Sequence, residues 1–124
     1  MFHPSLAHVP TAGNCYEDSL MILIEKKYDT EDETCVLCHG YPRLTRADDE
    51  FEPGTKYGHA WLERGEYAID VLTESIIPKV LFYAFGCIDE AGVTRYLKTE
   101  ALAEILDKSH YGPWAVEPAD ACFA

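Results

Sequence analysis

The sequence has little positive charge. Lysine and arginine together number 10 against 22 aspartates and glutamates, so the formal net charge of the 124 residues is −12. A chain this acidic is repelled by phosphate backbones and by anionic lipid surfaces. We therefore expect no direct binding of nucleic acid, and we favour a basic protein or peptide as the partner or substrate.

Long apolar runs are also missing. No stretch approaches the ~20 residues that a membrane-spanning helix needs, so we expect no membrane association. The N-terminus, Met1-Phe2-His3-Pro4, lacks a basic segment followed by an apolar one, which predicts a cytoplasmic protein without a signal peptide. The cysteines number five, and reduced thiols are the expectation for such a chain.

The composition is typical of a globular protein. Hydrophobic residues make up 48% of the chain and charged residues 26%, which are not the values of a disordered polypeptide. A chain of this length corresponds to one ordinary domain. We therefore expect a single domain over residues 1–124.

The first regular element predicted is a helix over residues 15–27. Asn14 is a good N-cap, and Glu17 follows three residues later, as in a capping box. Leu20, Leu23, Ile24 and Lys27 fall on one side, with Met21 beside them, as in a helix that packs against a core. With Asn14 as the cap, Cys15 is the first residue of this helix.

A series of strands follows the helix. The predicted strands are residues 34–41, 57–62, 67–73 and 93–97, and a second helix is expected at 100–108 after Thr99 as its cap. A further apolar run at 79–87 makes the number of strands after the first either three or four. The connections predict a mainly antiparallel sheet and an α+β fold.

The hairpin between the second and third strands brings a histidine and an aspartate together. A two-residue loop at Arg64-Gly65, or a four-residue loop over 63–66, places His59 directly opposite Asp70. Directly opposed residues share a face of the sheet, with Cβ atoms roughly 4.5–5.5 Å apart. An imidazole can donate a hydrogen bond to a carboxylate at that separation.

Cys15 adds the third group of a nucleophilic site. A thiol at the start of a helix faces backbone N–H groups and the positive end of the dipole, which lower its pKa. The same N–H groups can stabilise an oxyanion. Nucleophilic catalysis needs a thiolate, a base and a group that orients the base, and Cys15, His59 and Asp70 suit these roles. Taken alone, a cysteine at this position is more typical of a small core residue, and a histidine opposite an aspartate is more typical of a surface ion pair.

Three short motifs resemble those of transglutaminase-like proteins, which belong to the wider papain-like superfamily of cysteine enzymes. The motifs are Gly13-Asn14-Cys15, His59-Ala60-Trp61 and Ile69-Asp70. Arylamine N-acetyltransferases show a similar order. The resemblance covers about residues 13–73, and it implies a helix with the cysteine packed on an antiparallel sheet that carries the histidine and the aspartate. It also implies that Cys15 is the nucleophile, His59 the base and Asp70 the orienting group.

One feature departs from the papain-like pattern. Papain-like peptidases carry a glutamine a few residues before the cysteine as an oxyanion donor, and this sequence contains no glutamine. Asn14, Thr11 or backbone N–H groups would have to take that place.

A second cysteine pattern points to other chemistry. Residues 35–39, Cys-Val-Leu-Cys-His, match the signature for covalent haem, but such proteins are usually exported and the motif lies in a β-rich run. A zinc ribbon needs a second C-x-x-C, and none exists. We expect no cofactor and no metal, with a metal at Cys35 and Cys38 as an open alternative.

The sequence thus predicts a thiol-dependent hydrolase or acyl transferase that acts on an amide or thioester. A peptidase, a deamidase and a transglutaminase-type enzyme all fit, because the acyl group can pass to water or to an amine. The acidic segments 29–33 and 48–52 support an alternative of another class. In it, the protein is a catalytically silent acidic binding protein that inhibits a basic or nucleic-acid-binding partner.

Overall fold

The fold is a five-stranded antiparallel sheet with helices on both faces. The computed structural model describes residues 8–11, 13–43 and 56–114. The strands are β1 (Val36–Gly40), β2 (His59–Arg64), β3 (Tyr67–Asp70), β4 (Ser75–Pro78) and β5 (Thr94–Tyr96), in the order β4-β3-β2-β1-β5. The helices are α1 (Cys15–Glu25), α2 (Lys79–Gly86) and α3 (Lys98–Lys108), with a 3₁₀ turn η2 (Glu90–Gly92).

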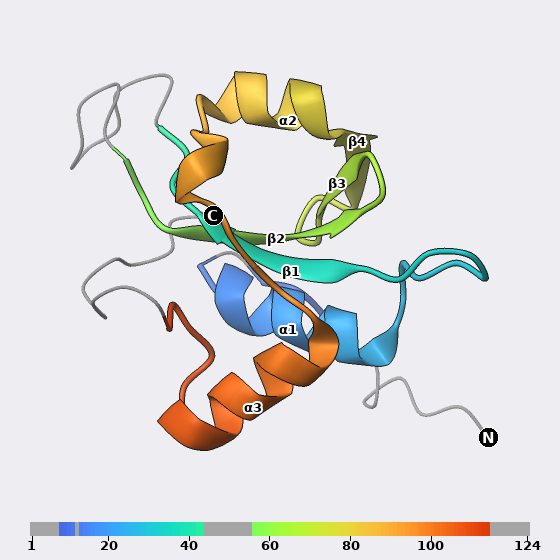
Figure 1. Ribbon diagram of the computed structural model, residues 1–124, viewed down its shortest axis with the longest axis vertical. Helices are drawn as coiled ribbons and strands as arrows, with labels where there is room; N and C mark the ends of the chain where they lie inside the picture. Colours follow the sequence, from blue (N-terminus) through green and yellow to red (C-terminus); the bar gives the residue numbers. More distant parts are fainter. Residues whose placement is uncertain (1–7, 12, 44–55, 115–124) are drawn as a thin grey trace.

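The helices divide between the two faces of the sheet. Helices α1 and α3 lie on one side, and α2 lies on the other (Figure 1). The predicted α+β class is therefore confirmed, with Cys15 in an N-terminal helix and a second helix near the C-terminal end of the described chain. The acidic segment 48–52 and Cys122, one of the five cysteines, lie outside the described residues.

Helix α1 begins at Cys15, as its sequence predicts, and ends at Glu25. Asn14 is the N-cap residue, but its side chain donates to the Thr11 hydroxyl at 2.7 Å instead of capping the helix, so the predicted capping box is wrong. The buried carboxylate of Asp18 accepts the Thr11 N–H at 2.8 Å. The segment before the helix is therefore held by the helix's own first turns.

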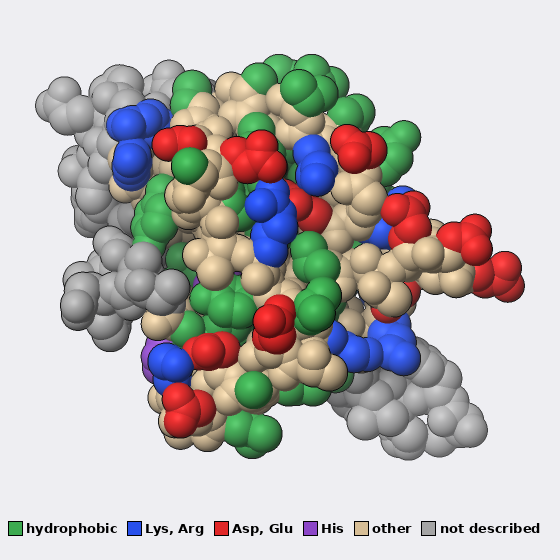
Figure 2. Space-filling view, in the orientation of Figure 1, with side chains coloured by type: hydrophobic (Ala, Val, Ile, Leu, Met, Phe, Trp, Pro, Cys, Tyr) green, Lys and Arg blue, Asp and Glu red, His purple; other side chains and the backbone are tan. Residues whose placement is uncertain are grey.

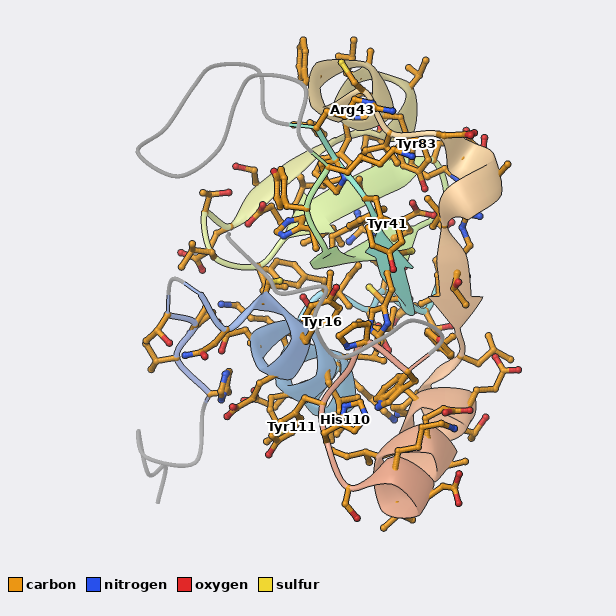
Figure 3. The ribbon with its side chains drawn as sticks, turned by 90° about the vertical axis from the view of Figure 1, so that its left-hand side faces the viewer. Tyr16, Tyr41, Arg43, Tyr83, His110 and Tyr111 are labelled. Atoms are coloured by element: carbon orange, nitrogen blue, oxygen red, sulfur yellow. The ribbon has the colours of Figure 1, made fainter. Side chains whose placement is uncertain are left out.

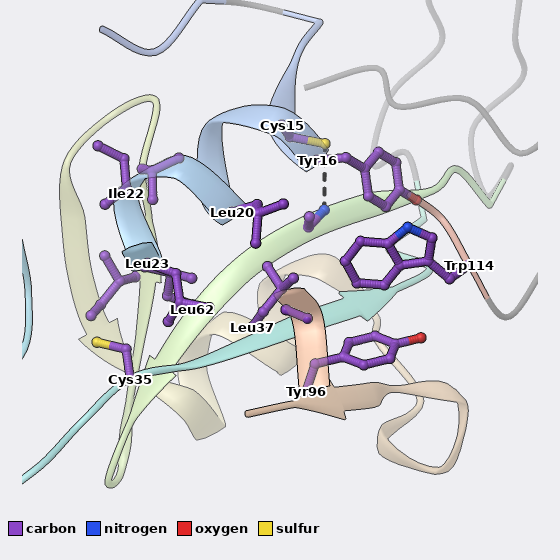
Figure 4. Packing of buried hydrophobic residues seen from close by; sticks show 14 residues of the cluster. Cys15, Tyr16, Leu20, Ile22, Leu23, Cys35, Leu37, Leu62, Tyr96 and Trp114 are labelled. Atoms are coloured by element: carbon purple, nitrogen blue, oxygen red, sulfur yellow. Dashed lines mark hydrogen bonds between the residues drawn. The ribbon is translucent and has the colours of Figure 1, made fainter. Parts of the chain in front are cut away.

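The main core lies between the sheet and the helices α1 and α3 (Figure 4). Leu20 of α1, Leu37 of β1 and Leu62 of β2 are completely buried there. Each fully buried leucine contributes roughly 1.5–3 kcal/mol relative to an exposed one. The burial of Leu20 and Leu23 agrees with the apolar side predicted for α1, but Ile24 is 37% exposed and Ile22 is buried in its place.

The other face of the sheet buries a smaller cluster beneath α2. Cys38, Trp61 and Ala68 come from the sheet, and the ring of Phe82 on α2 lies 5.1 Å from that of Trp61. Cys38 follows Leu37 along β1 and lies on the opposite face, as the alternation of a strand requires.

A buried carboxylate joins three elements on this face. Glu63 of β2 is 3% exposed and accepts hydrogen bonds from the Trp61 indole N–H at 3.0 Å and from Arg95 Nε of β5 at 2.9 Å. It also accepts the Tyr83 hydroxyl of α2. Burial raises the pKa of Glu63, but these donors more than offset that effect, so its pKa is lower than usual.

Several predicted elements differ from the structure; the strand predicted over 67–73, for example, ends at Asp70. The apolar run 79–87 forms helix α2, and the strand before it, β4, was not predicted. A short continuous apolar run does not distinguish a buried strand from a helix. The second predicted helix begins at Lys98, with Leu97 as its N-cap instead of Thr99. Glu100 stabilises this start by accepting the Leu97 N–H at 2.8 Å.

Candidate active site

The sulfur of Cys15 lies against the strand that carries His59. Cys15 is the first residue of α1 and is 5% exposed. Its Sγ accepts the backbone N–H of Ala60 at 3.4 Å, the contact that Figure 4 marks with a dashed line. Because Ala60 follows His59 directly, the sulfur is next to the peptide bond that joins these two residues.

Cys15 is not a thiol in this structure. It is disulfide-bonded, whereas Cys35, Cys38 and Cys87 are free cysteines. The expectation of reduced thiols is therefore wrong for Cys15. Since the thiolate is the nucleophilic form of cysteine, any chemistry at Cys15 requires that the disulfide first be reduced.

The hairpin register differs from the predicted one by two residues. Arg64 pairs with Tyr67 and Leu62 pairs with Ile69, so the turn is Gly65–Glu66 and His59 is not directly opposite Asp70. Arg64 stays in the strand because its guanidinium donates to the Tyr28 carbonyl at 2.8 Å. Gly65 supplies the positive φ of +57° at the turn.

His59 and Asp70 nevertheless meet, because a shift of two residues leaves each side chain on its face of the sheet. The His59 Nε2 atom lies 3.6 Å from Asp70 Oδ2. His59 is 5% exposed, and the Asp70 side chain is 25% exposed. The pair is thus largely shielded from water. The expected contact between His59 and Asp70 exists, but the two residues are diagonal neighbours across the hairpin instead of directly opposed ones.

Asp70 is held in its ionised form. Its Oδ1 atom accepts the backbone N–H groups of Leu72 at 3.0 Å and Thr73 at 3.2 Å. Burial raises the pKa of Asp70, but the interaction with His59 and these two donors outweigh it, and the pKa lies below its usual value. An ionised, fixed carboxylate is suited to orient an imidazole.

Two aromatic rings lie near the imidazole of His59, one from Trp61 of β2 and one from Tyr57, which precedes the strand. The ring of Trp61 stacks on it at an interplanar angle of 26° and a centroid distance of 5.9 Å. The ring of Tyr57 lies 6.1 Å away. Burial, together with the charge of Asp70, raises the pKa of Tyr57. Trp61 is itself fixed by its hydrogen bond to Glu63.

The structure narrows the choice of oxyanion donor. The Asn14 amide donates to the Thr11 hydroxyl, so the Asn14 side chain is bonded within the turn before α1. The Thr11 hydroxyl and the backbone N–H groups at the start of α1 are the other predicted candidates.

The C-x-x-C-H segment places its two cysteines on opposite faces of the sheet, so Cys35 and Cys38 are not positioned to bind one metal ion together. Cys35 lies in the cluster beneath α1, and Cys38 lies in the cluster beneath α2, on the other face of the sheet. Burial raises the pKa of the Cys35 thiol to about 12, and it also raises the pKa of Cys38. Within residues 8–11, 13–43 and 56–114, no group of three His, Cys, Asp or Glu side chains is placed to hold a metal ion.

His39 is a residue near the site to which the sequence assigned no role of its own. It pairs across the strands with Ala60, the residue that contacts the Cys15 sulfur. Neither of its ring nitrogens has a hydrogen-bond partner among the described residues. Burial lowers the pKa of His39 to about 3, so the ring is neutral. No sequence pattern signals this environment, because it arises from three separate parts of the chain.

Three aromatic rings from separate parts of the chain surround the imidazole of His39. The rings of Tyr16, Tyr96 and Trp114 lie 4.8, 5.1 and 5.1 Å from it. Figure 3 looks onto this end of the molecule and labels Tyr16 of α1 together with His110 and Tyr111 of the segment that leads to Trp114. A Cβ atom at Gly112 would come within 2.8 Å of the His39 ring, so only glycine allows this close approach. The segment before Trp114 is thereby packed next to the residue that follows Cys15.

Comparison of the chain with protein-family models, with curated proteins and with solved structures finds no match. None of the helices in the described part of the chain is long and apolar enough to cross a membrane. The interpretation of the site therefore depends on the geometry of Cys15, His59 and Asp70.

Proposed function

We propose that the protein is a thiol-dependent hydrolase or acyl transferase that acts on an amide or thioester through Cys15, His59 and Asp70. The observation that carries this proposal is a pair of contacts. The Cys15 sulfur lies 3.4 Å from the backbone nitrogen of Ala60, the residue after His59. The His59 Nε2 atom lies 3.6 Å from Asp70 Oδ2. The Cys15 sulfur thus lies against the backbone of β2, the strand that carries His59, and the His59 side chain contacts Asp70 of β3.

The reaction begins from reduced Cys15. The Ala60 N–H and the positive end of α1 stabilise its thiolate, and His59 takes up the proton. The thiolate attacks the carbonyl carbon and forms a C–S bond, and the oxyanion is stabilised by N–H groups at the start of α1. His59 then protonates the departing amine or thiol as its bond to the carbonyl breaks, which leaves an acyl group on Cys15.

The acyl group passes to water or to an amine in the second step. His59 removes a proton from that acceptor, the acceptor forms a bond to the carbonyl carbon, and the C–S bond breaks to return the Cys15 thiolate. Water gives a peptidase or deamidase, and an amine gives a transglutaminase-type product. The resemblance to transglutaminase-like proteins, together with the α+β fold, supports this reaction class, and family membership stays a prediction.

The first test measures the reactivity of each cysteine in the reduced protein. After reduction with a phosphine, iodoacetamide is applied from about pH 5 to pH 9, and peptide mass spectrometry gives the rate for each thiol. Cys87, an exposed free cysteine, is the reference within the same chain. We expect Cys15 to react rapidly well below the usual pKa of ~8.5, despite its burial.

Two variants make this test specific. His59→Ala should abolish the reactivity of Cys15 at low pH, whereas His110→Ala, which removes an exposed histidine, should leave it unchanged. A Cys15 that reacts no faster than Cys87 in the reduced wild type would contradict the proposal.

The second test separates catalysis from silent binding. In the disulfide form Cys15 lacks a thiol, so that form cannot carry out the proposed chemistry. Small aromatic thioesters are offered to the reduced protein, and intact mass spectrometry records any acyl adduct. We expect the adduct on wild type and none on Cys15→Ala. If the reduced wild type acquires no adduct while its fold is intact, the inhibitor alternative is favoured.

A further inference from the structure

Helix α2 is apolar on both of its faces, yet none of its residues is buried. Its inner face packs on the sheet through Phe82 and Tyr83, which contact the ring of Trp61. Its outer face consists of four exposed residues at helical spacing, and we call them the α2 outer face. They are Val80, Leu81, Ala84 and Phe85.

The exposure of this face is large. Val80 is 74% exposed, Leu81 45% and Phe85 66%. Figure 2 shows hydrophobic side chains gathered along the edge of the molecule that α2 occupies in Figure 1. A helix that is apolar all round is normally covered on both sides, and a contiguous exposed apolar patch marks an interaction site. Leu106 of α3, 83% exposed, provides a contrast as an exposed hydrophobic residue outside this face.

A hollow with acidic walls adjoins the α2 outer face. Its volume is about 310 Å³, and its lining consists of Glu66, Lys79, Val80, Tyr83 and Glu90. The Lys79 ammonium lies 3.9 Å from the buried carboxylate of Glu63, which also pairs with Arg95. Three carboxylates, Glu63, Glu66 and Glu90, thus stand against the two positive charges of Lys79 and Arg95 around the hollow. Glu66 is exposed, and the Glu90 side chain is 69% exposed with one contact to Arg95. The two carboxylates make this hollow suitable for a cationic side chain.

We propose that the α2 outer face and this hollow dock a polypeptide segment that is apolar on one side and carries lysine or arginine beside it. The apolar side chains would cover Leu81 and Phe85, and a basic side chain would enter between Glu66 and Glu90. The net charge of −12 favours a basic partner for the whole molecule. A second copy of this chain would bring the same negative charge, which opposes self-association.

This inference goes beyond the proposed function and holds whether or not Cys15 is a nucleophile. If the protein is also the enzyme proposed above, the docked segment belongs to its substrate. The two surfaces are connected, since Phe82 of α2 packs on Trp61 and Trp61 stacks on His59. The binding test below uses no catalytic readout, so either proposal can fail alone.

The test measures the binding of synthetic peptides by fluorescence anisotropy. The probe is a labelled amphipathic helix of leucine and lysine, and its control is the same helix with glutamate in place of lysine. We expect the lysine peptide to bind, the glutamate peptide to fail, and added salt to weaken the binding. Leu81→Ser combined with Phe85→Ser should lower the affinity at least about tenfold, because it removes the apolar contact. The control variant Leu106→Ser should bind as the wild type does.

A second pair of variants tests the hollow. Glu66→Gln combined with Glu90→Gln should weaken binding several-fold and reduce its dependence on salt. Glu31→Gln combined with Asp32→Asn makes the same change of charge in an exposed turn and should have a smaller effect. Equal loss in both charge variants would overturn the role of the hollow.

Three outcomes would overturn the docking proposal. The first is equal binding of the lysine peptide by the wild type and by the Leu81→Ser, Phe85→Ser variant. The second is a wild-type dimer in light scattering that this variant dissociates, since a second copy would then cover the face. The third is sedimentation of the wild type, but not the variant, with phosphatidylcholine vesicles, because the face would then meet a lipid surface.

Discussion

The neutral state of His39 should make the stability of the protein depend on pH. The imidazole is buried among aromatic rings, and burial alone lowers its pKa to about 3. In the unfolded chain the same group titrates near 6.5. Between these values the unfolded chain binds the proton and the folded protein does not. Stability is therefore complete above about pH 6.5 and is lost as the pH falls towards 3.

The size of the effect follows from the two pKa values. Each unit of difference corresponds to 1.36 kcal/mol, so the full loss is about 5 kcal/mol, and about 2 kcal/mol is lost by pH 5. Asp70 and Glu63 also have shifted pKa values, but both are lowered. Their stabilisation is lost mainly below about pH 4.5, so a measurement at pH 5 chiefly reports on His39.

The assay compares the wild type with His39→Leu. Urea unfolding at about pH 7.5 and about pH 5 gives the free energy of unfolding of each protein under both conditions. We expect the wild type to lose about 2 kcal/mol more than the variant between the two conditions. His110→Leu, at an exposed histidine, should keep the wild-type dependence on pH. The reasoning is refuted if wild type and His39→Leu lose the same stability, or if NMR shows the His39 ring titrating near 6.5.

Two further substitutions test the packing that supports the site. Glu63→Gln should lower the free energy of unfolding by roughly 3–5 kcal/mol, because it removes a buried charge from its partners, whereas the exposed Glu74→Gln should lower it by less than about 1 kcal/mol. Gly40→Ala should cost roughly 1–3 kcal/mol in urea unfolding, because its Cβ would lie 2.5 Å from the Trp61 ring. Gly92→Ala should be close to neutral, since a Cβ there meets nothing within 4 Å. Equal effects within either pair would contradict the corresponding argument.

Local patterns in the sequence predicted much of the fold. The start of α1 at Cys15 follows from signals within a few residues, and such signals are available without tertiary information. The hairpin between β2 and β3 was also predicted, although its turn is Gly65–Glu66. The predicted register was wrong because the predicted turn Arg64–Gly65 and the observed turn Gly65–Glu66 both include Gly65. The difference lies in Arg64, whose side chain donates to the distant carbonyl of Tyr28.

Helix α2 shows a different limit of sequence reasoning. Its outer face is as apolar as its inner face, so the run 79–87 has no periodicity that distinguishes a helix from a strand. The three rings around His39 could not be predicted either, because Tyr16, Tyr96 and Trp114 come from distant positions in the chain. Nothing near any of the three residues in the sequence indicates that their rings meet around His39.

The sequence alone determined the strongly acidic charge, the position of Cys15 at a helix start, and the shared face of His59 and Asp70. That shared face survives the error in register because side chains alternate with a period of two along a strand. The tertiary structure decided the contact of the Cys15 sulfur with the Ala60 N–H, the neutral state of His39, and the apolar face that α2 leaves exposed. These features depend on how elements far apart in sequence pack, and burial and contact distance exist only once that packing has formed.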